Sequence, residues 1–250
     1  MREHRVLIAA GENPDERVFE FSLLKEVPPY VLYRAKDAQK LRNLKIKEWG
    51  EICRTPEDFG VPKEYAEEQL QELIEMDDDE FFDDLTRGYE TDDDGNAISR
   101  MNPEGRFVAA TRGGSFAQPF LLKDGTTAYQ AKKSDIDWSK IHMNKEYVNL
   151  YERTWEMCME GLEPVSDVDR QVYENMRDKK SYFEKFKDKQ EYVASCSSFW
   201  AFAFLNDADI WLDADDCPVS QFEWMSTYYD RFIKRLPDGV ELTIFEYITE

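Results

Sequence analysis

Carboxylates are the most numerous side chains in this sequence that could bind or react. The 250 residues include 53 Asp and Glu against 32 Lys and Arg, a formal net charge of −21. Residues 77–94 hold ten acids and one base, Arg87, and residues 190–230 hold eight acids and no Lys or Arg. Such a surface repels a nucleic-acid backbone and attracts proteins that bind one. We therefore expect no direct contact with nucleic acid.

Four carboxylates in the second zone are candidate ligands for a divalent metal. Asp213, Asp215 and Asp216 follow a predicted strand, and Glu223 lies in the next predicted helix. Carboxylate oxygens suit hard cations, and the spacing is loosely like that of metal-dependent nucleases. A solvated loop beside a strand is the simpler interpretation. No cofactor is therefore expected, and a metal-dependent hydrolase or nuclease is kept as an alternative.

Two shorter motifs give weaker signals. With Gly95 at the sixth position of an EF-hand loop, the twelfth position is Met101, where a bidentate Glu is required. A solvated acidic turn is therefore predicted over 92–96. The pair Gly113-Gly114 could offer backbone N–H groups to a phosphate, although a single pair favours a bulge or hairpin turn. The sequence leaves open whether this region binds a ligand.

The spacing of Ser, Cys and His in the sequence does not indicate a site for nucleophilic catalysis. The two histidines, His4 and His142, lie in no recognisable catalytic context. The spacing of the cysteines fits neither a zinc site nor a secreted disulfide framework and predicts buried, reduced thiols. No catalytic residue is predicted, which favours a protein that is not an enzyme. The four cysteines are Cys53, Cys158, Cys196 and Cys217.

Apolar residues interleave with the acids of the first zone. Phe81, Phe82 and Leu85 recur at helical spacing, which predicts a helix docked by one apolar side. Aromatic contact area surrounded by carboxylates suits a basic groove on another protein, and the alternative is that the rings face the chain's own core. The predicted partner-binding residues are Asp77, Asp78, Asp79, Glu80, Phe81, Phe82, Asp83, Asp84, Asp92, Asp93 and Asp94.

The elements that must position these residues indicate an α+β protein with a mostly antiparallel sheet and packed helices. The C-terminal part predicts a β-β-α-β unit, whose last strand alternates between apolar and polar residues. The predicted strands cover 5–10, 106–122 (one or two strands), 126–131, 192–205, 210–213 and 240–248. The predicted helices cover 35–53, 62–76, 144–161, 166–189 and 220–236, and 17–24 is either strand or helix.

A hydrophobic fraction of 42% and an aromatic fraction of 14% predict a folded core beneath the acidic surface. We expect a single α+β domain over 1–250, with a division into 1–133, which contains the acidic segment 77–94, and 134–250 as the alternative. No apolar run reaches the roughly 18 residues of a membrane span. The apolar run before Gly11 is too short for a signal peptide, so a cytoplasmic location is expected.

Short motifs spread along the chain resemble a family of uncharacterised proteins encoded by phages and mobile elements of Gram-positive bacteria. The motifs are Val27-Pro28-Pro29-Tyr30, Asn102-Pro103, Arg106-Phe107, Gly113-Gly114, Phe116, Lys132-Lys133, Asp135-Ile136-Asp137 and Leu236-Pro237-Asp238. The family's Trp-Asp-Trp-Tyr is replaced by residues 107–110 here, and its Arg after the glycines by Ser115. The resemblance implies a phage-borne context in the host cytoplasm and transfers no activity.

These observations favour an acidic viral protein that binds and inhibits a host nucleic-acid-binding protein. A defence nuclease or an RNA-guided effector would fit, with the carboxylates acting as a partial nucleic-acid mimic of the anti-defence or anti-CRISPR kind. Besides the hydrolase, a second alternative is a small-nucleotide sponge with a pocket formed by Phe199, Trp200, Trp211 and Trp224. The sequence leaves the partner and the oligomeric state open.

Overall fold

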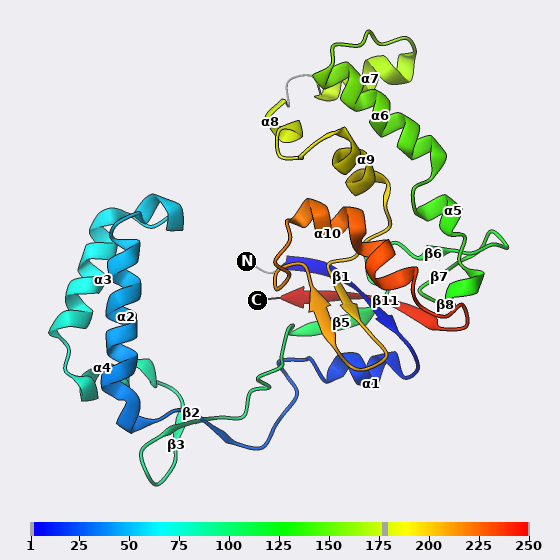
Figure 1. Ribbon diagram of the computed structural model, residues 1–250. Coiled ribbons are helices and arrows are strands. Elements are labelled where there is room, and N and C mark those ends of the chain that lie inside the picture. Colours follow the sequence, from blue (N-terminus) through cyan, green and yellow to red (C-terminus); the bar gives the residue numbers. More distant parts are fainter. Residues whose placement is uncertain (1–2, 177–179, 250) are drawn as a thin grey trace. The chain divides into compact units, whose positions relative to one another are not determined.

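The computed structural model describes residues 3–176 and 180–249 (Figure 1). The chain forms two compact units. The sheet unit comprises Met1–Lys25 with Pro103–Glu250, and the acidic unit comprises Glu26–Asn102. The observed unit boundaries, after Lys25 and after Asn102, differ from the division between residues 133 and 134 that the sequence suggested as an alternative. Strands from both sides of that boundary pair within one sheet, so the boundary would cut through it.

The sheet unit is built on a six-stranded sheet of order β10-β9-β1-β11-β5, in which β8 also pairs with β11. The predicted α+β class with a mostly antiparallel sheet is confirmed. β9 runs parallel to β1, whereas β1, β5 and β8 each run antiparallel to β11, and β10 antiparallel to β9. The strands are β1 (Glu3–Ala10), β5 (Ala109–Arg112), β8 (Gln130–Lys132), β9 (Ala203–Leu205), β10 (Trp211–Asp213) and β11 (Glu241–Thr249).

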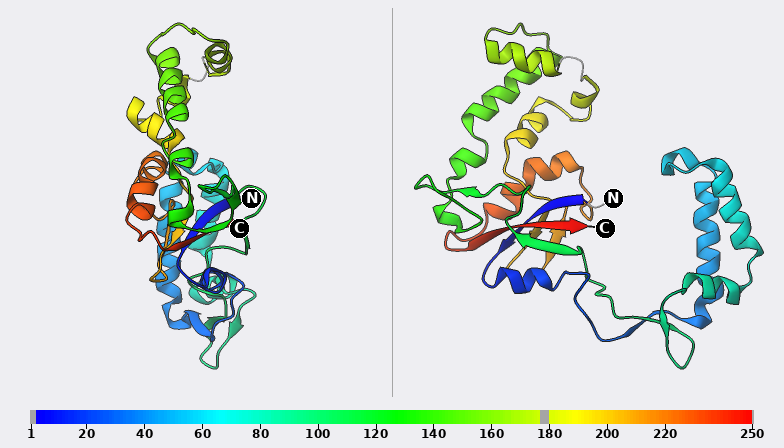
Figure 2. Two further views of the ribbon diagram at one scale, coloured as in Figure 1. Left: turned by 90° about the vertical axis from the view of Figure 1, so that its right-hand side faces the viewer. Right: turned by 180° about the vertical axis from the view of Figure 1, so that it is seen from behind.

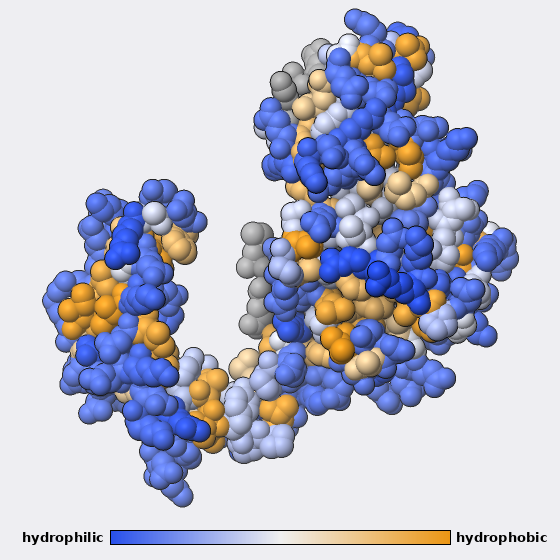
Figure 3. Space-filling model, in the orientation of Figure 1, coloured by the Kyte–Doolittle hydropathy of each residue, from blue (hydrophilic) through white to orange (hydrophobic). Residues whose placement is uncertain are grey.

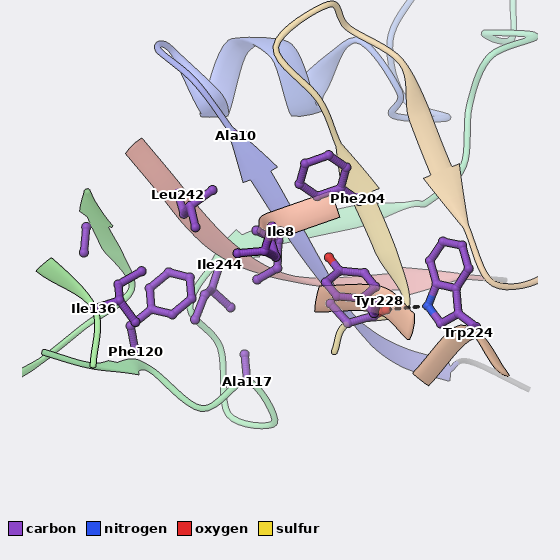
Figure 4. Close-up of a cluster of buried hydrophobic side chains, with 13 residues drawn as sticks. Ile8, Ala10, Ala117, Phe120, Ile136, Phe204, Trp224, Tyr228, Leu242 and Ile244 are labelled. Carbon is purple, nitrogen blue, oxygen red and sulfur yellow. Dashed lines mark hydrogen bonds between the residues drawn. The ribbon is translucent and has the colours of Figure 1, made fainter. Parts of the chain in front are cut away.

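Strand β11 is an interior strand that pairs with β1, β5 and β8, and it is buried on both faces. Leu242 and Ile244 join the cluster beneath α10 (Gln221–Tyr228), which Figure 4 shows with Trp224 and Tyr228. Phe245 and Tyr247 join a second cluster on the face covered by α1 (Pro14–Phe19). The expected alternation of apolar and polar residues along this strand is therefore wrong, because a strand covered on both faces has no solvent side.

The predicted strand over 192–205 is wrong in its first half, which forms helix α9 (Lys189–Ser197). The Asp188 carboxylate accepts the Glu191 N–H at 2.9 Å and caps this helix. Tyr192 then packs on Trp155 and Phe183, with ring centroids 5.5 and 5.1 Å apart. A continuous apolar run has no period that separates a buried helix from a buried strand. Only Ala203–Leu205 continues as strand β9, so the C-terminal β-β-α-β order is retained.

The other elements of the sheet unit follow most of the predicted ranges. A π-helical turn, Tyr229–Ile233, extends α10, and residues 14–19 resolve as helix rather than strand. The remaining elements are β6 (Phe120–Leu121), β7 (Thr127–Ala128), the 3₁₀ turn Lys133–Asp135, α5 (Trp138–Ile141), α6 (Lys145–Met159), α7 (Asp167–Met176) and α8 (Lys180–Phe183). The predicted region 166–189 includes residues 177–179, which lie outside the described residues.

The acidic unit combines a small sheet with three helices (Figure 2). α2 and α3 form a helical hairpin, and α2 also packs against α4. The predicted helices over 35–53 and 62–76 are confirmed. The elements are β2 (Tyr30–Tyr33), β3 (Glu90–Thr91) and β4 (Ala97–Ser99) in the order β2-β4-β3, with α2 (Ala38–Ile52), α3 (Lys63–Glu75), α4 (Asp78–Leu85) and 3₁₀ turns Ala35–Asp37 and Pro56–Phe59.

Among the helices of the described residues, none is both long enough and apolar enough to cross a membrane.

Candidate functional site

Exposed carboxylates concentrate on the acidic unit. Its 77 residues carry 21 acids and 10 bases, and so about half of the chain's net charge. Between residues 64 and 94 there are fifteen acids and one base, Arg87. Of these fifteen, all but Asp78 and Asp92 are exposed. We call the exposed set the carboxylate surface: Glu64, Glu67, Glu68, Glu72, Glu75, Asp77, Asp79, Glu80, Asp83, Asp84, Glu90, Asp93 and Asp94.

Part of the predicted partner-binding set builds helix α4. Asp77 Oδ1 accepts the N–H groups of Asp79 at 3.0 Å and Glu80 at 2.8 Å, while Glu80 Oε2 accepts the Asp77 N–H at 3.3 Å. This capping box satisfies N–H groups that the first helical turn leaves unpaired. Asp78 forms an ion pair with Arg42 of α2 at 2.8 Å. Asp77, Asp78 and Glu80 therefore have structural roles within the unit.

The two aromatic residues of the predicted set are buried. Phe81 is 4% exposed and Phe82 is 7% exposed, so neither ring offers contact area to a partner. The helical period places these rings on the side of α4 that packs within the unit and leaves Asp79 and Asp83 in solvent. Among the described residues, no hydrogen bond or ion pair engages either of these two carboxylates. The structure therefore agrees with the alternative interpretation of the sequence, in which the Phe81 and Phe82 rings face the chain's own core.

The Asp92–Asn96 stretch closes the β3–β4 hairpin. The Asp92 carboxylate accepts the Asp94 and Asn96 N–H groups at 3.0 and 2.9 Å and the Asn96 side-chain amide at 3.0 Å. These donors, led by the Asn96 side chain, lower the pKa of Asp92. Gly95 takes a φ of 77°, which glycine adopts without strain. Asp93 and Asp94 stand exposed at the tip, and the stretch is an acidic hairpin turn rather than an EF-hand loop.

The candidate metal ligands are engaged by other side chains. Asp213, Asp215 and Asp216 line a cavity of about 470 Å³ that Arg5 and Arg106 also line. Asp215 is paired with Arg5, and Asp216 with Arg106 at 2.6 Å. Asp213 accepts the indole N–H of Trp211 at 3.0 Å and the Asp216 N–H at 2.8 Å.

Glu223 does not join these three carboxylates. It lies in the first turn of α10, where its N–H donates to the Ser220 hydroxyl at 3.1 Å, and it is not part of the cavity lining. Across residues 3–176 and 180–249, no group of three or more His, Cys, Asp or Glu is arranged to hold a metal ion. The four carboxylates therefore do not form the site that the hydrolase alternative requires.

The Gly113-Gly114 loop wraps a carboxylate of the chain itself. Glu246, 7% exposed on β11, accepts the Phe116 N–H at 2.9 Å and contacts His4 Nδ1 at 2.5 Å. The Phe116 N–H is the leading cause that lowers the pKa of Glu246. Gly114 has a φ of 104°, and a Cβ there would overlap the Glu246 carboxylate. The Gly113 N–H considered for phosphate donates instead to the Ile244 carbonyl at 2.8 Å, and the Phe116 N–H that follows serves Glu246. Sequence reasoning missed Glu246 because it lies 130 positions from Phe116.

The surroundings of the cysteines and of His142 do not activate them as nucleophiles. All four cysteines are free and half-buried. Burial raises the pKa of Cys196 to about 11, the reverse of what a reactive thiol needs. His142 stacks on Tyr229 with ring centroids 3.8 Å apart, and burial lowers its pKa. Its Nδ1 accepts the Phe199 N–H at 3.3 Å, which is a structural use of the imidazole.

The four aromatic residues predicted to form one ligand pocket are separated. Trp224 packs in the cluster beneath α10, and Trp211 packs in the cluster on the opposite face of the sheet. The predicted shared pocket is therefore wrong. Phe199 and Trp200 do line a cavity together, with side chains from elsewhere in the sheet unit.

Several motifs behind the phage-family resemblance meet in the sheet unit. Lys133 Nζ donates to the Leu236 carbonyl at 2.5 Å and lies 3.3 Å from the Asp238 carboxylate. Phe107 packs on Trp211 and Tyr247 with ring centroids 5.9 and 6.0 Å apart. These contacts stabilise the fold around β11. No family model, curated protein or solved structure matches this chain, so the resemblance stays a prediction.

Proposed function

We propose that this chain is a non-enzymatic inhibitor whose acidic unit binds the basic surface of a host nucleic-acid-binding protein. The observation that carries the proposal is the carboxylate surface, where fifteen acids face a single base over residues 64–94. Because helices and a closed hairpin hold these charges, binding would not require the acidic chain to become ordered first.

The charge density of α4 supports partial mimicry of nucleic acid. Its eight residues include five acids, and at 1.5 Å per residue they extend over about 12 Å. That corresponds to one charge in roughly 2.4 Å, against about 1.7 Å along duplex DNA. Helix α3, with five acids in thirteen residues, is sparser, at one charge in about 4 Å. The α4 end of the unit is therefore the better match for a phosphate-binding groove.

Apolar contact area comes from α2 and α3 rather than from the buried phenylalanines. Leu44, Tyr65 and Ile74 are each about half exposed, at 55, 49 and 51%. Figure 3 shows a hydrophobic patch over these two helices, bordered by hydrophilic residues. Exposed apolar groups within a charged rim are typical of a protein-binding surface. This arrangement supports a protein partner.

The proposed setting is the cytoplasm of a bacterial host, with the chain encoded by a phage or mobile element. There it would compete with nucleic acid for the basic groove of a defence nuclease or RNA-guided effector. Because the interaction is electrostatic and solvent-exposed, salt should weaken it steeply.

Capture from a host lysate tests the proposal. The tagged chain is the bait at about 50 and 300 mM NaCl, alongside a variant with Asp79, Asp83, Asp93 and Asp94 changed to Asn. In the part of the chain that the structure describes, no hydrogen bond or ion pair engages these four carboxylates, so the acidic unit should stay folded. The matched control changes four exposed acids of the sheet unit to their amides: Glu12, Glu163, Glu184 and Asp207.

The expected result is one stoichiometric nucleic-acid-binding partner at low salt, lost at high salt, weakened by the acidic-unit variant and kept by the control. Equal retention by both variants would overturn the role of the carboxylate surface. Absence of any such partner from the low-salt lysate would overturn the proposed function.

A further inference from the structure

A second candidate site belongs to the sheet unit, and none of the residues that line it is part of the carboxylate surface. It is a cavity of about 500 Å³ lined by residues of β1, the 116–119 segment, α5, α6, the 198–200 segment and β11. This volume falls within the range of about 300–1,000 Å³ that is common for small-molecule sites. The residues that line it show which class of molecule would fit.

The cavity combines an apolar floor with aromatic walls. Ile8 and Ile244, which belong to the cluster in Figure 4, are 1% and 2% exposed and form part of the lining. Phe116 and Tyr147 also line the cavity, yet they leave 67% and 54% of their surface exposed. Rings left in water beside a cavity are available to pack on a planar ligand.

One aromatic wall is held rigidly by its neighbours. The Phe199 ring packs on Trp138 and Phe120, with centroids 5.4 and 5.9 Å apart. Its backbone N–H donates to His142 Nδ1 at 3.3 Å. A wall fixed before binding lowers the ordering cost of association.

Lys140 is the charged residue of this lining. In the ranges the structure describes, no carboxylate lies within ion-pair distance of its ammonium, although the chain carries 53 acids. Gln118 and Ser198 add neutral hydrogen-bonding groups. A cation without a partner beside aromatic rings favours a ligand that brings its own negative charge.

We infer that this cavity binds a small planar aromatic molecule with a negatively charged group, with the ring against Phe116, Tyr147 and Trp200 and the charge at Lys140. A nucleotide and an aromatic carboxylic acid share this chemistry. The inference does not depend on the acidic unit, since every residue involved belongs to the sheet unit.

A matched pair of fluorescent probes tests both parts of the inference with the full chain. 8-Anilinonaphthalene-1-sulfonate carries an aromatic ring system and one negative charge, and N-phenyl-1-naphthylamine has the same rings without the charge. Titration should give one site per chain for the charged probe. The variant Lys140→Gln should weaken the charged probe about tenfold and leave the neutral probe within about twofold. Phe116→Ala should weaken both probes, about fivefold or more.

Two control variants separate the cavity from other exposed surface. Lys145→Gln removes an exposed lysine outside the lining, and Phe59→Ala removes a ring that is 57% exposed on the acidic unit. Both should bind the two probes as the unmodified chain does. Equal losses in Lys145→Gln and Lys140→Gln, or in Phe59→Ala and Phe116→Ala, would overturn the inference.

Competition against the bound charged probe identifies the natural class of ligand. Displacement by AMP but not by indole-3-acetate would assign a nucleotide, and the reverse would assign an aromatic carboxylate. Failure of both to displace the probe would overturn the inference, because the cavity would then accept only a dye.

Discussion

At the scale of single residues, the most constrained position is Gly114. It combines a φ of 104° with a position at which an added Cβ would overlap the buried Glu246 side chain. A methyl group there would both strain the backbone and displace a carboxylate from its hydrogen bonds. The glycine at position 114 therefore lets the loop backbone approach the buried Glu246 carboxylate closely.

We predict that Gly114→Ala lowers the free energy of unfolding by about 3 kcal/mol or more, because strain and overlap act together. The control is Gly125→Ala, where φ is 87° but no atom of the described residues lies within 4 Å of the added Cβ. Only strain acts there, so the expected loss is about 1 kcal/mol. Urea unfolding measures both, and equal losses would contradict the proposed packing of Gly114 on Glu246.

Acid should destabilise the sheet unit through Glu246. Its pKa is lowered in the folded state from an ordinary 4.5, so its stabilising contribution is present above pH 4.5 and is lost as pH falls through the folded pKa. Between about pH 5 and pH 3 the unmodified chain should therefore lose more stability than Glu246→Gln. Urea midpoints across this range measure the difference, and parallel curves would show that Glu246 contributes nothing to acid sensitivity.

At the scale of elements, α4 depends on its first turn. Asp77 accepts two backbone N–H groups there, and asparagine can replace it as an N-cap whereas alanine cannot. We predict that Asp77→Ala destabilises the acidic unit by about 1 kcal/mol and that Asp77→Asn costs a few tenths. Thermal unfolding followed by circular dichroism would measure both, and an Asn variant as unstable as the Ala variant would count against the cap.

The elements that sequence could predict are those with a clear period and clear ends. The helices over 38–52 and 63–75 have amphipathic patterns, and strand β1 ends at a glycine. Helix α9 was missed because its apolar run has no period, and its cap at Asp188 is a single residue.

Candidate-site residues were harder to place than the elements. The orientation of Phe81 and Phe82 depends on packing within the unit, which local spacing leaves open. The contact between Gly114 and Glu246 joins distant positions and has no local signal. By contrast, the exposed acids of α3 and α4 follow directly from composition, because charged residues rarely lie fully buried.

At the scale of the whole molecule, the negative charge that would attract a basic partner also lowers the stability of the folded chain. The acidic unit carries 21 acids and 10 bases, so its carboxylates repel one another. It also has few large buried side chains to offset that repulsion, chiefly Phe81 and Phe82. The unit should therefore be more sensitive to salt than the sheet unit.

We predict that raising NaCl from about 10 to 150 mM increases the melting temperature of the full chain, since screening relieves this repulsion. The Asp79, Asp83, Asp93 and Asp94 to Asn variant should melt higher than the unmodified chain at low salt, and the difference should shrink at high salt. Differential scanning calorimetry measures both. A variant that gains nothing at low salt would contradict the idea that these charges repel one another.

We propose that the carboxylate surface binds a basic, nucleic-acid-binding protein. The most direct test is the slope of the logarithm of affinity against the logarithm of salt concentration for the captured partner, measured with the unmodified chain and with the four-residue Asn variant. We predict a steep negative slope for the unmodified chain and a clearly shallower one for the variant, with weaker binding at low salt. Identical slopes and affinities would contradict the claim, because they would show that these carboxylates do not meet the partner's charges.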